Sequence, residues 1–264
     1  MDDADLYDYQ LPPELIAQEP LADRAAARLL HVRRGDGTIA HRHVRDLPEI
    51  LRPGDLLVVN DTRVVPARLV GRRALTGGKW EGLFLREQAD GPHGGAWVVL
   101  AHTRGRPGIG ERVILTDRDG ADTLAITLVG RAEGGAWLAM PGTPASFATL
   151  LDRVGRVPLP GYIRGGAERP GDRERYQTVF ARAAGSAAAP TAGLHFTADL
   201  LAALAARGVE RAAVTLHVGL DTFRPITAAR IEDHPMHTEW CACPAETAAA
   251  VAATKARGGR VVAV

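Results

Sequence analysis

The sequence predicts a mixed α/β fold in which a discontinuous α/β domain is interrupted by an inserted all-β, barrel-like domain. Three observations lead to this fold class. An apolar strand, Leu56 to Val59, ends at a polar quartet. From about 68 to 140, short apolar runs alternate with glycine clusters and no helical pattern interrupts them. After Pro144 a strand–helix–strand order returns, which implies a parallel sheet.

The inserted segment contains six apolar runs of strand length. Glycine pairs or clusters separate most of them, as expected for strands joined by tight turns. This spacing predicts a small barrel or sandwich over 68–143, with the α/β domain formed by 1–67 and 144–264. The six runs are Ala67–Val70, Trp80–Leu85, Ala96–Ala101, Arg112–Leu115, Thr123–Val129 and Ala136–Met140.

The α/β part carries recognisable start and stop signals. Thr197 is a good helix cap and Gly208 a good helix terminator, which predicts a helix from Thr197 to Arg207. Ligands of parallel sheets bind outside the carboxyl ends of the strands, so we expect the site residues at these ends. The other expected elements are helices at Leu11–Gln18 and Ser146–Val154 and strands at Tyr176–Ala181 and Val209–Val218.

Composition narrows the function class. The chain has 264 residues, 46% hydrophobic and 24% charged, which is typical of a globular protein and excludes a disordered or collagen-like one. Its apolar runs are much shorter than a membrane span, and its acidic N-terminus is unlike a signal peptide. We therefore expect a cytoplasmic protein without membrane association. The two cysteines are too few for a disulfide framework.

His217 is the first candidate for chemistry. It lies at the carboxyl end of the expected strand Val209–Val218, on the same face as Thr215, and is followed by Gly219 and Asp221. A histidine with a carboxylate four residues on suits general acid–base work near neutral pH. A packed structural histidine explains the strand equally well.

His195 is the second candidate. It follows a run of small and turn-forming residues, Ala189 to Leu194, and lies just before the N-terminus of the expected helix. Backbone N–H groups at such a site favour a carboxylate or phosphate. A tight strand-to-helix connection, in which Gly193 merely permits the turn, is the slightly favoured alternative.

The segment His234–Cys243 contains two histidines, a carboxylate and two thiols. Such a group resembles a zinc site, but the spacing is not a standard one, and Pro235 fits poorly with His234 and His237 sharing one regular helix face. A metal is therefore not favoured.

The polar quartet Asn60–Arg63, with Arg68 beyond it, is the last candidate. Polar residues after an apolar strand often form a turn. They also suit a hydroxylated, anionic ligand. Taken alone, none of these clusters selects one function.

Together these clusters form a collinear set of motifs that spans the chain. The set resembles the S-adenosylmethionine:tRNA ribosyltransferase-isomerase family of queuosine biosynthesis. The motifs are Tyr7–Pro12, Leu15–Gln18, Asp23–Arg24, Gly54–Leu69, Arg175–Ala181, Gly185–Ser186, Ala188–Thr197, Leu216–Leu220, Thr222–Pro225 and His234–Glu239.

The resemblance implies an activity. The family transfers and isomerises the ribosyl part of S-adenosylmethionine onto 7-aminomethyl-7-deazaguanine at the tRNA wobble position. The product is epoxyqueuosine-tRNA, with release of adenine and methionine. It implies S-adenosylmethionine as ribosyl-donor substrate, tRNA bearing the deazaguanine as partner, and no metal. The family's α/β domain with an inserted barrel matches the fold class predicted above. We expect a monomer.

The same resemblance implies the site residues. We expect His217 to take part in proton transfer and His195 mainly to shape the binding loop. Asn60 and Asp61 suit ribose hydroxyls or the methionine ammonium, and Arg63 or Arg68 suits its carboxylate. The expected catalytic residues are His217, His195, Asp221 and Glu239. The expected substrate-binding residues are Asn60, Asp61, Thr62, Arg63, Arg68, Tyr176, Gln177, Thr191, Gly193, Gly219 and His237.

Three departures from the family pattern qualify this expectation. Asp221 stands where the family usually has glycine, and Cys241 and Cys243 fall outside the pattern. The chain also stops at a strand-like run, 259–264, where relatives continue, so we expect the α/β domain to be incomplete at its C-terminus. Two other functions stay open: a non-catalytic RNA-binding fragment, and a nucleoside-directed transferase or hydrolase acting on a free small molecule.

Overall fold

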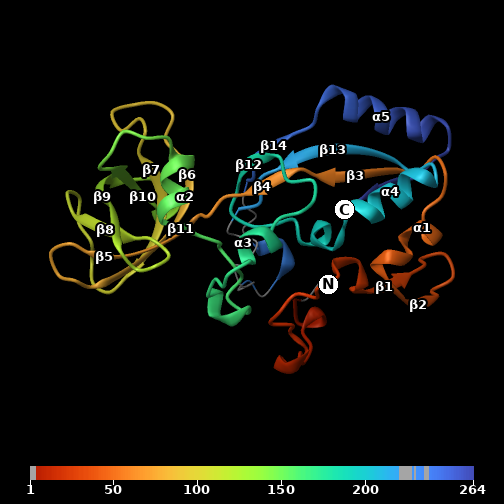
Figure 1. The fold of residues 1–264 in the computed structure, drawn as a ribbon, viewed down its shortest axis with the longest axis horizontal. Coiled ribbons are helices and arrows are strands. Elements are labelled where there is room, and N and C mark those ends of the chain that lie inside the picture. Colours follow the sequence, from red (N-terminus) through yellow and green to blue (C-terminus); the bar gives the residue numbers. More distant parts are fainter. Residues whose placement is uncertain (1–3, 220–227, 229, 235–237) are drawn as a thin grey trace. The chain divides into compact units, whose positions relative to one another are not determined.

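The computed structural model of the chain describes residues 4–219, 228, 230–234 and 238–264 (Figure 1). Its contacts group into two compact units, each described here by itself. The first unit comprises Met1–Arg63, Gly161–Gly165 and Glu174–Val264, and the second comprises Val64–Pro160 and Gly166–Arg173. The predicted fold class, mixed α/β with a barrel, is confirmed. The domain boundaries at 67/68 and 143/144 stay a prediction, because compactness alone does not define a domain that folds or acts independently.

A four-stranded sheet forms the centre of the first unit, in the order β14-β13-β3-β15. Both β13 and β15 run parallel to β3, whereas β14 is antiparallel to β13. The parallel sheet expected from the strand–helix–strand order is thus present. The strands are β3 (Leu56–Asn60), β13 (Glu210–Leu216), β14 (Cys241–Ala242) and β15 (Val261–Ala263).

Helices cover both faces of this sheet (Figure 1). On one face, α4 (Ala198–Ala206) and α1 (Leu47–Ile50) pack over the apolar side chains of β3. On the other face lies α5 (Ala245–Ala256), where the Thr247 hydroxyl donates to the Ala213 carbonyl at 2.7 Å. The buried core on the α4 side consists of Val44, Leu51, Leu57, Val59, Phe196, Leu200, Leu204 and Val209.

The helix ends follow the sequence signals. The Thr197 hydroxyl accepts a hydrogen bond from the Leu200 N–H at 3.1 Å, which caps α4 as predicted. Ser146 caps α2 (Phe147–Val154) in the second unit by the same means. Among the described residues, no helix has the length and apolar character that crossing a membrane requires.

Two short pairs of strands complete the first unit. One is the antiparallel hairpin of β1 (Arg28–Val32) and β2 (Ile39–His43). The other joins β4 (Thr62–Val64) to β12 (Ala183–Ser186). This second pair matters for the site, because it brings the residues that follow β3 beside the segment around Gly185.

The second unit is a closed antiparallel barrel of six strands. The order β5-β6-β7-β10-β9-β8 closes through a pairing of β5 with β8, and β11 (Gly155–Arg156) adds to β5. All six runs predicted from the sequence are strands here. They are β5 (Arg68–Arg73), β6 (Lys79–Glu87), β7 (Trp97–Thr103), β8 (Arg112–Thr116), β9 (Asp122–Arg131) and β10 (Trp137–Pro141).

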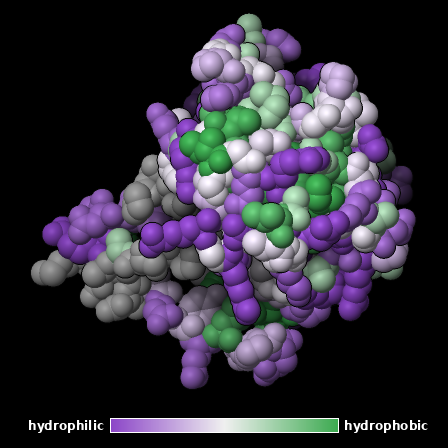
Figure 2. All heavy atoms as spheres, turned by 90° about the vertical axis from the view of Figure 1, so that its left-hand side faces the viewer, coloured by the Kyte–Doolittle hydropathy of each residue, from purple (hydrophilic) through white to green (hydrophobic). Residues whose placement is uncertain are grey.

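Side chains from every second position of the strands fill the interior of the barrel. In β9 buried and half-buried residues alternate along the strand, as expected when one face of a sheet is inside. Trp80 and Trp97 are almost fully buried. Gly71 lies where β5 meets β8, and a Cβ there would stand 2.3 Å from the Ile114 carbonyl oxygen, so glycine permits the closure. On the face drawn in Figure 2, hydrophobic residues form small groups separated by hydrophilic ones.

Two predicted elements are wrong. Leu11–Gln18 forms only the 3-10 turn Pro13–Leu15, because the segment buries no apolar face that would stabilise a longer helix by packing. Tyr176–Ala181 is not a strand; the strand lies further on, at Ala183–Ser186. The Gln177 carbonyl accepts from the Arg24 guanidinium at 2.7 Å instead of entering a sheet.

An ion pair ties together the amino ends of β3 and β15. The Asp55 carboxylate is buried and accepts from Arg260 Nε at 3.0 Å and from the Arg52 N–H at 2.8 Å. The hydrogen bond from Arg260 is the main reason why the pKa of Asp55 is lowered. Replacing the carboxylate leaves the guanidinium and an N–H group with a weaker partner.

We therefore expect Asp55→Asn to lower the free energy of unfolding by about 1–3 kcal/mol at pH 7. A lowered native pKa stabilises the fold above the unfolded-state pKa, and this contribution is lost as pH falls through the native pKa. The difference from the wild type should therefore shrink in urea titrations below about pH 4. Glu49→Gln, which removes only an exposed pair with Arg42, is the matched control and should change stability by less than about 0.5 kcal/mol. Equal stability of Asp55→Asn and the wild type at pH 7 would contradict this prediction.

Candidate active site

The carboxyl ends of β3 and β13 are joined by the side chain of Asn60. Its Nδ2 donates to the Leu216 carbonyl at 2.9 Å, and its Oδ1 accepts from the Leu216 N–H at 3.0 Å. The same oxygen accepts from the Thr62 N–H at 3.1 Å. The backbone register of the two strands ends at the pair Asn60 and Val214. The amide thus continues the ladder beyond the point where β3 leaves the sheet.

The Asp61 carboxylate lies beside this junction and is only 4% exposed. Its Oδ1 accepts from the Thr215 hydroxyl at 2.6 Å. Its Oδ2 accepts from Arg182 Nε at 3.1 Å and Nη2 at 2.8 Å. Burying a carboxylate is costly unless a cation and hydrogen-bond donors lie beside it, and these two residues supply both.

His217 is held on several sides. Its Nδ1 lies 2.8 Å from the Thr62 hydroxyl oxygen, and its ring stacks on Trp240 with centroids 4.7 Å apart and planes 22° apart. The backbone N–H of His217 donates to the Trp240 carbonyl at 3.0 Å. A Cβ on Gly185 would lie 2.6 Å from Nε2, so this glycine is needed where the ring packs on the backbone. His217 follows directly after β13, which ends at Leu216, two residues before the predicted end of this strand at Val218. That His217 and Thr215 share a side stays a prediction.

Burial lowers the pKa of His217, and the nearby charge of Asp61 raises it in part. The lowered pKa favours the neutral imidazole, which is the form that can accept a proton. The hydrogen bond with Thr62 is compatible with either ring tautomer. A neutral, oriented imidazole next to a buried carboxylate suits general base chemistry.

Two further contacts fix the chain just after His217. The Val218 N–H donates to the Ser186 hydroxyl at 2.9 Å, and that hydroxyl donates to the Ala188 carbonyl at 2.6 Å. The Gly219 N–H donates to Glu239 Oε1 at 2.7 Å. The structure therefore brings Glu239 and Gly219, both predicted site residues, into direct contact.

A second cluster surrounds His195, the last residue of the 3-10 helix Thr191–His195. Burial is the main cause that lowers the pKa of His195, and the positive charge of Arg24 lowers it further, although the residue as a whole is exposed. Arg24 donates to the carbonyls of Gln177 at 2.7 Å and Leu194 at 3.2 Å. Arg24 therefore joins the N-terminal segment to both loops.

The remaining predicted residues have varied surroundings. Arg68 lies in the barrel unit, where it donates to Glu81 at 3.1 Å and to the Gly166 carbonyl. Tyr176 is buried, and this burial raises the pKa of its hydroxyl. Gly193 is buried, whereas Arg63 and Thr191 are exposed. Asp221 and His237 lie outside the described residues.

Sequence reasoning did not assign a site role to Arg182, Trp240, Gly185 or Arg24. Gly185, Ser186 and Arg24 belong to the quoted motifs, so a signal was present. Arg182 meets Asp61 across 121 residues of chain, and no local pattern could indicate this contact. Among the described residues, no three His, Cys, Asp or Glu side chains gather as metal ligands. Since His237 is not among them, the absence of a metal stays a prediction.

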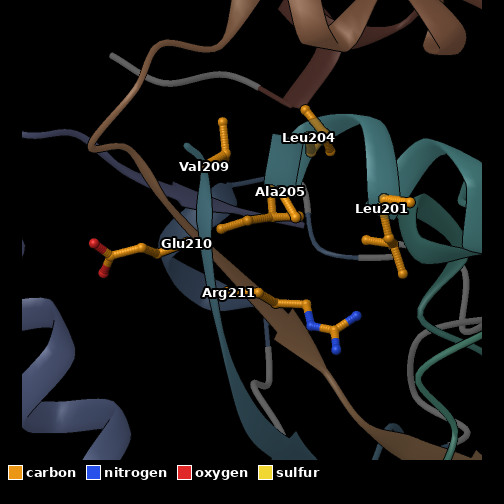
Figure 3. A pocket seen from close by; sticks show the side chains of 8 residues that line it. Leu201, Leu204, Ala205, Val209, Glu210 and Arg211 are labelled. Carbon is orange, nitrogen blue, oxygen red and sulfur yellow. The ribbon is translucent and has the colours of Figure 1, made fainter. Parts of the chain in front are cut away.

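A cavity of about 360 Å³ with both apolar and charged lining residues lies elsewhere in the first unit, between α4 and the amino end of β13 (Figure 3). Leu201, Leu204 and Ala205 line it from the helix, Val209 from the connection before β13, and Glu210 and Arg211 from the strand. Arg211 and His217 are six residues apart on an extended strand, or roughly 20 Å. The cavity is therefore not part of the polar cluster around His217.

The fold and this cluster define an α/β protein with a barrel and a polar site at the carboxyl ends of parallel strands. A family model described as "Queuosine biosynthesis protein" matches residues 4–264, and the chain belongs to this family. The S-adenosylmethionine:tRNA ribosyltransferase-isomerases of Gloeobacter violaceus and Acidiphilium cryptum are 48% and 51% identical to it. These matches cover 98% of this chain and 70% and 72% of those proteins.

A solved structure is also similar. The S-adenosylmethionine tRNA ribosyltransferase from Thermotoga maritima is 30% identical, and the match covers 97% of this chain and 68% of that one. The TM-score of the superposition is 0.41. The sequence resemblance to this family is therefore confirmed by the family and sequence matches above.

The packing of His217 on Gly185 generates a prediction. In Gly185→Ala the new Cβ would displace the imidazole from its partly buried position, and its pKa should rise toward the ordinary value near 6.5. Histidine-ring NMR titrations would measure this pKa. Gly161→Ala is the matched control, since a Cβ there meets no atom within 4 Å. An unchanged pKa of His217 in folded Gly185→Ala would show that the contact does not position the ring.

Proposed function

We propose that this chain is a tRNA ribosyltransferase-isomerase of queuosine biosynthesis. It transfers and isomerises the ribosyl part of S-adenosylmethionine onto 7-aminomethyl-7-deazaguanine at the tRNA wobble position. The products are epoxyqueuosine-tRNA, adenine and methionine. The observation that carries this proposal is the position of His217, which lies directly after a parallel strand against the Thr62 hydroxyl and Gly185, in a chain that belongs to the family.

The chemistry requires a base that removes the acidified proton beside the sulfonium. A neutral imidazole suits this task, since its ordinary pKa lies near the working pH. Thr62 and Gly185 restrict how the His217 ring can turn. We therefore assign proton transfer to His217. His195, Glu239 and Asp221 remain candidates for the proton that departing adenine accepts.

Asn60 and Asp61 support the site in a different way. Their polar atoms bond to Leu216, Thr215 and Arg182 within the chain, which favours positioning roles over direct contact with ribose. Arg63 is exposed next to Thr62, so its guanidinium suits the methionine carboxylate. Arg68 is the second candidate for that contact. The other proposed substrate-binding residues are Thr62, Tyr176, Gln177, Thr191, Gly193, Gly219 and His237.

The proposal includes the setting of the reaction. S-adenosylmethionine is a substrate, and the ribosyl transfer proposed here uses no metal. The partner is tRNA bearing the aminomethyl-deazaguanine. We place the protein in the cytoplasm as a monomer, with a discontinuous catalytic domain, 1–67 and 144–264, and a barrel domain, 68–143.

The reaction itself is the first test. S-adenosylmethionine labelled in the ribose is incubated with precursor-bearing tRNA, and adenine release and label in the tRNA are measured. We expect both, and only when the modified tRNA is present. Transfer of the methyl group instead, retention of RNA without turnover, or adenine release without RNA would each contradict the proposal. The last two outcomes correspond to an RNA-binding fragment and to an enzyme acting on a free small molecule.

Two histidine variants test the assignment of proton transfer. His217→Ala should lower the single-turnover rate by roughly two to four orders of magnitude, with little change in substrate binding. His195→Ala should mainly weaken binding. Melting curves recorded beside the rates separate catalysis from folding. If His217→Ala keeps the wild-type rate while its melting temperature falls, His217 is a structural residue.

A further inference from the structure

We propose that Trp240 binds the adenine ring of S-adenosylmethionine by stacking it on the indole face opposite His217. The inference rests on the proposed function, because it concerns the donor substrate of the same site. It adds a recognition role to a residue that stacks on a candidate catalytic group.

Trp240 combines exposure with a fixed position. It is 58% exposed, although it stacks on the His217 ring at 4.7 Å. Its carbonyl accepts from the His217 N–H at 3.0 Å, and the next residue, Cys241, pairs with Leu216 in the sheet. Isolated exposed hydrophobic residues are common and need no function. Trp240 differs because backbone bonds hold it beside the candidate base.

A large ring that is held in place but left exposed suits stacking of a planar heterocycle. Indole and purine rings attract one another through apolar burial and offset stacking, which need no exact hydrogen-bond geometry. Little conformational entropy is lost, because the protein already holds the indole against His217. A flat, fused heterocycle is thus the class of ligand that this surface selects.

The order of the layers favours adenine as that heterocycle. A ring stacked on the indole face opposite His217 is separated from the imidazole by the indole itself. It is therefore beyond hydrogen-bond reach of His217. His217 would therefore not protonate the stacked ring. Adenine is joined to the ribose, whose carbon beside the sulfonium loses the proton. Anchoring adenine one layer away leaves the sugar to extend toward the base.

Tryptophan fluorescence can report on this contact. The chain has four tryptophans. Trp80, Trp97 and Trp137 belong to the barrel and are 0%, 1% and 4% exposed. Trp240 is the exposed one, so a soluble heterocycle that quenches by stacking acts on its emission.

The experiment titrates the full chain with S-adenosylmethionine, with adenosine and with a 7-deazaguanine nucleoside, and follows emission. We expect saturable quenching by S-adenosylmethionine and adenosine that is lost in Trp240→Phe and retained in Trp137→Phe. By calorimetry, Trp240→Ala should bind S-adenosylmethionine about tenfold more weakly, and Trp240→Phe should recover most of the affinity. Melting curves identify variants that fail to fold.

Three results would overturn the proposal. They are unchanged S-adenosylmethionine affinity in folded Trp240→Ala, quenching that persists in Trp240→Phe, and quenching by the deazaguanine nucleoside alone. None of these readouts requires turnover. Adenine stacking without ribosyl transfer would therefore reject the proposed function and leave this inference standing, whereas transfer with unaltered binding in Trp240→Ala would do the reverse.

Discussion

The site depends on the Asn60 amide, which bonds both backbone groups of Leu216. Parallel strands diverge where one leaves the sheet, and unpaired backbone groups there would have to face water or remain unsatisfied. The amide takes the place of the missing strand partner. It thereby holds the end of β13 beside the residues after β3, so that Thr62 meets His217. This bracket therefore supports the contact between the Thr62 hydroxyl and the His217 ring, beside the other contacts that hold this ring.

A buried charge gives the junction its second constraint. Asp61 lies within hydrogen-bond distance of Thr215 and Arg182, and its field partly offsets the effect of burial on His217. Removing one partner from such an arrangement leaves a buried charge without compensation, which is more costly than never having formed the pair. Polar groups at this junction are thus mutually dependent, and we expect their substitutions to be non-additive.

The two ends of the sheet carry different tasks. At the amino ends the pair of Asp55 and Arg260 joins β3 to β15, and its groups satisfy one another. At the carboxyl ends lies the candidate site, where His217 stacks on Trp240 and Trp240 stays exposed. The ion pair of Asp55 and Arg260 thus lies at the opposite end of the sheet from the candidate site. Outside the sheet, the Arg24 guanidinium binds the carbonyls of Gln177 and Leu194, which belong to two different segments.

Local patterns were enough to predict what depends on neighbours in sequence. The strands of the barrel follow from apolar runs of strand length separated by glycine turns, the start of α4 follows from Thr197, and the place of His217 near the end of a strand follows from the apolar run before it. The same reasoning failed at Leu11–Gln18 and Tyr176–Ala181, where distant contacts or their absence override local preference. Only the tertiary structure could decide that Arg182 neutralises Asp61 and that Trp240 stacks on His217. Those contacts join segments far apart in the chain, and the local sequence pattern of one segment does not indicate which distant segment packs against it.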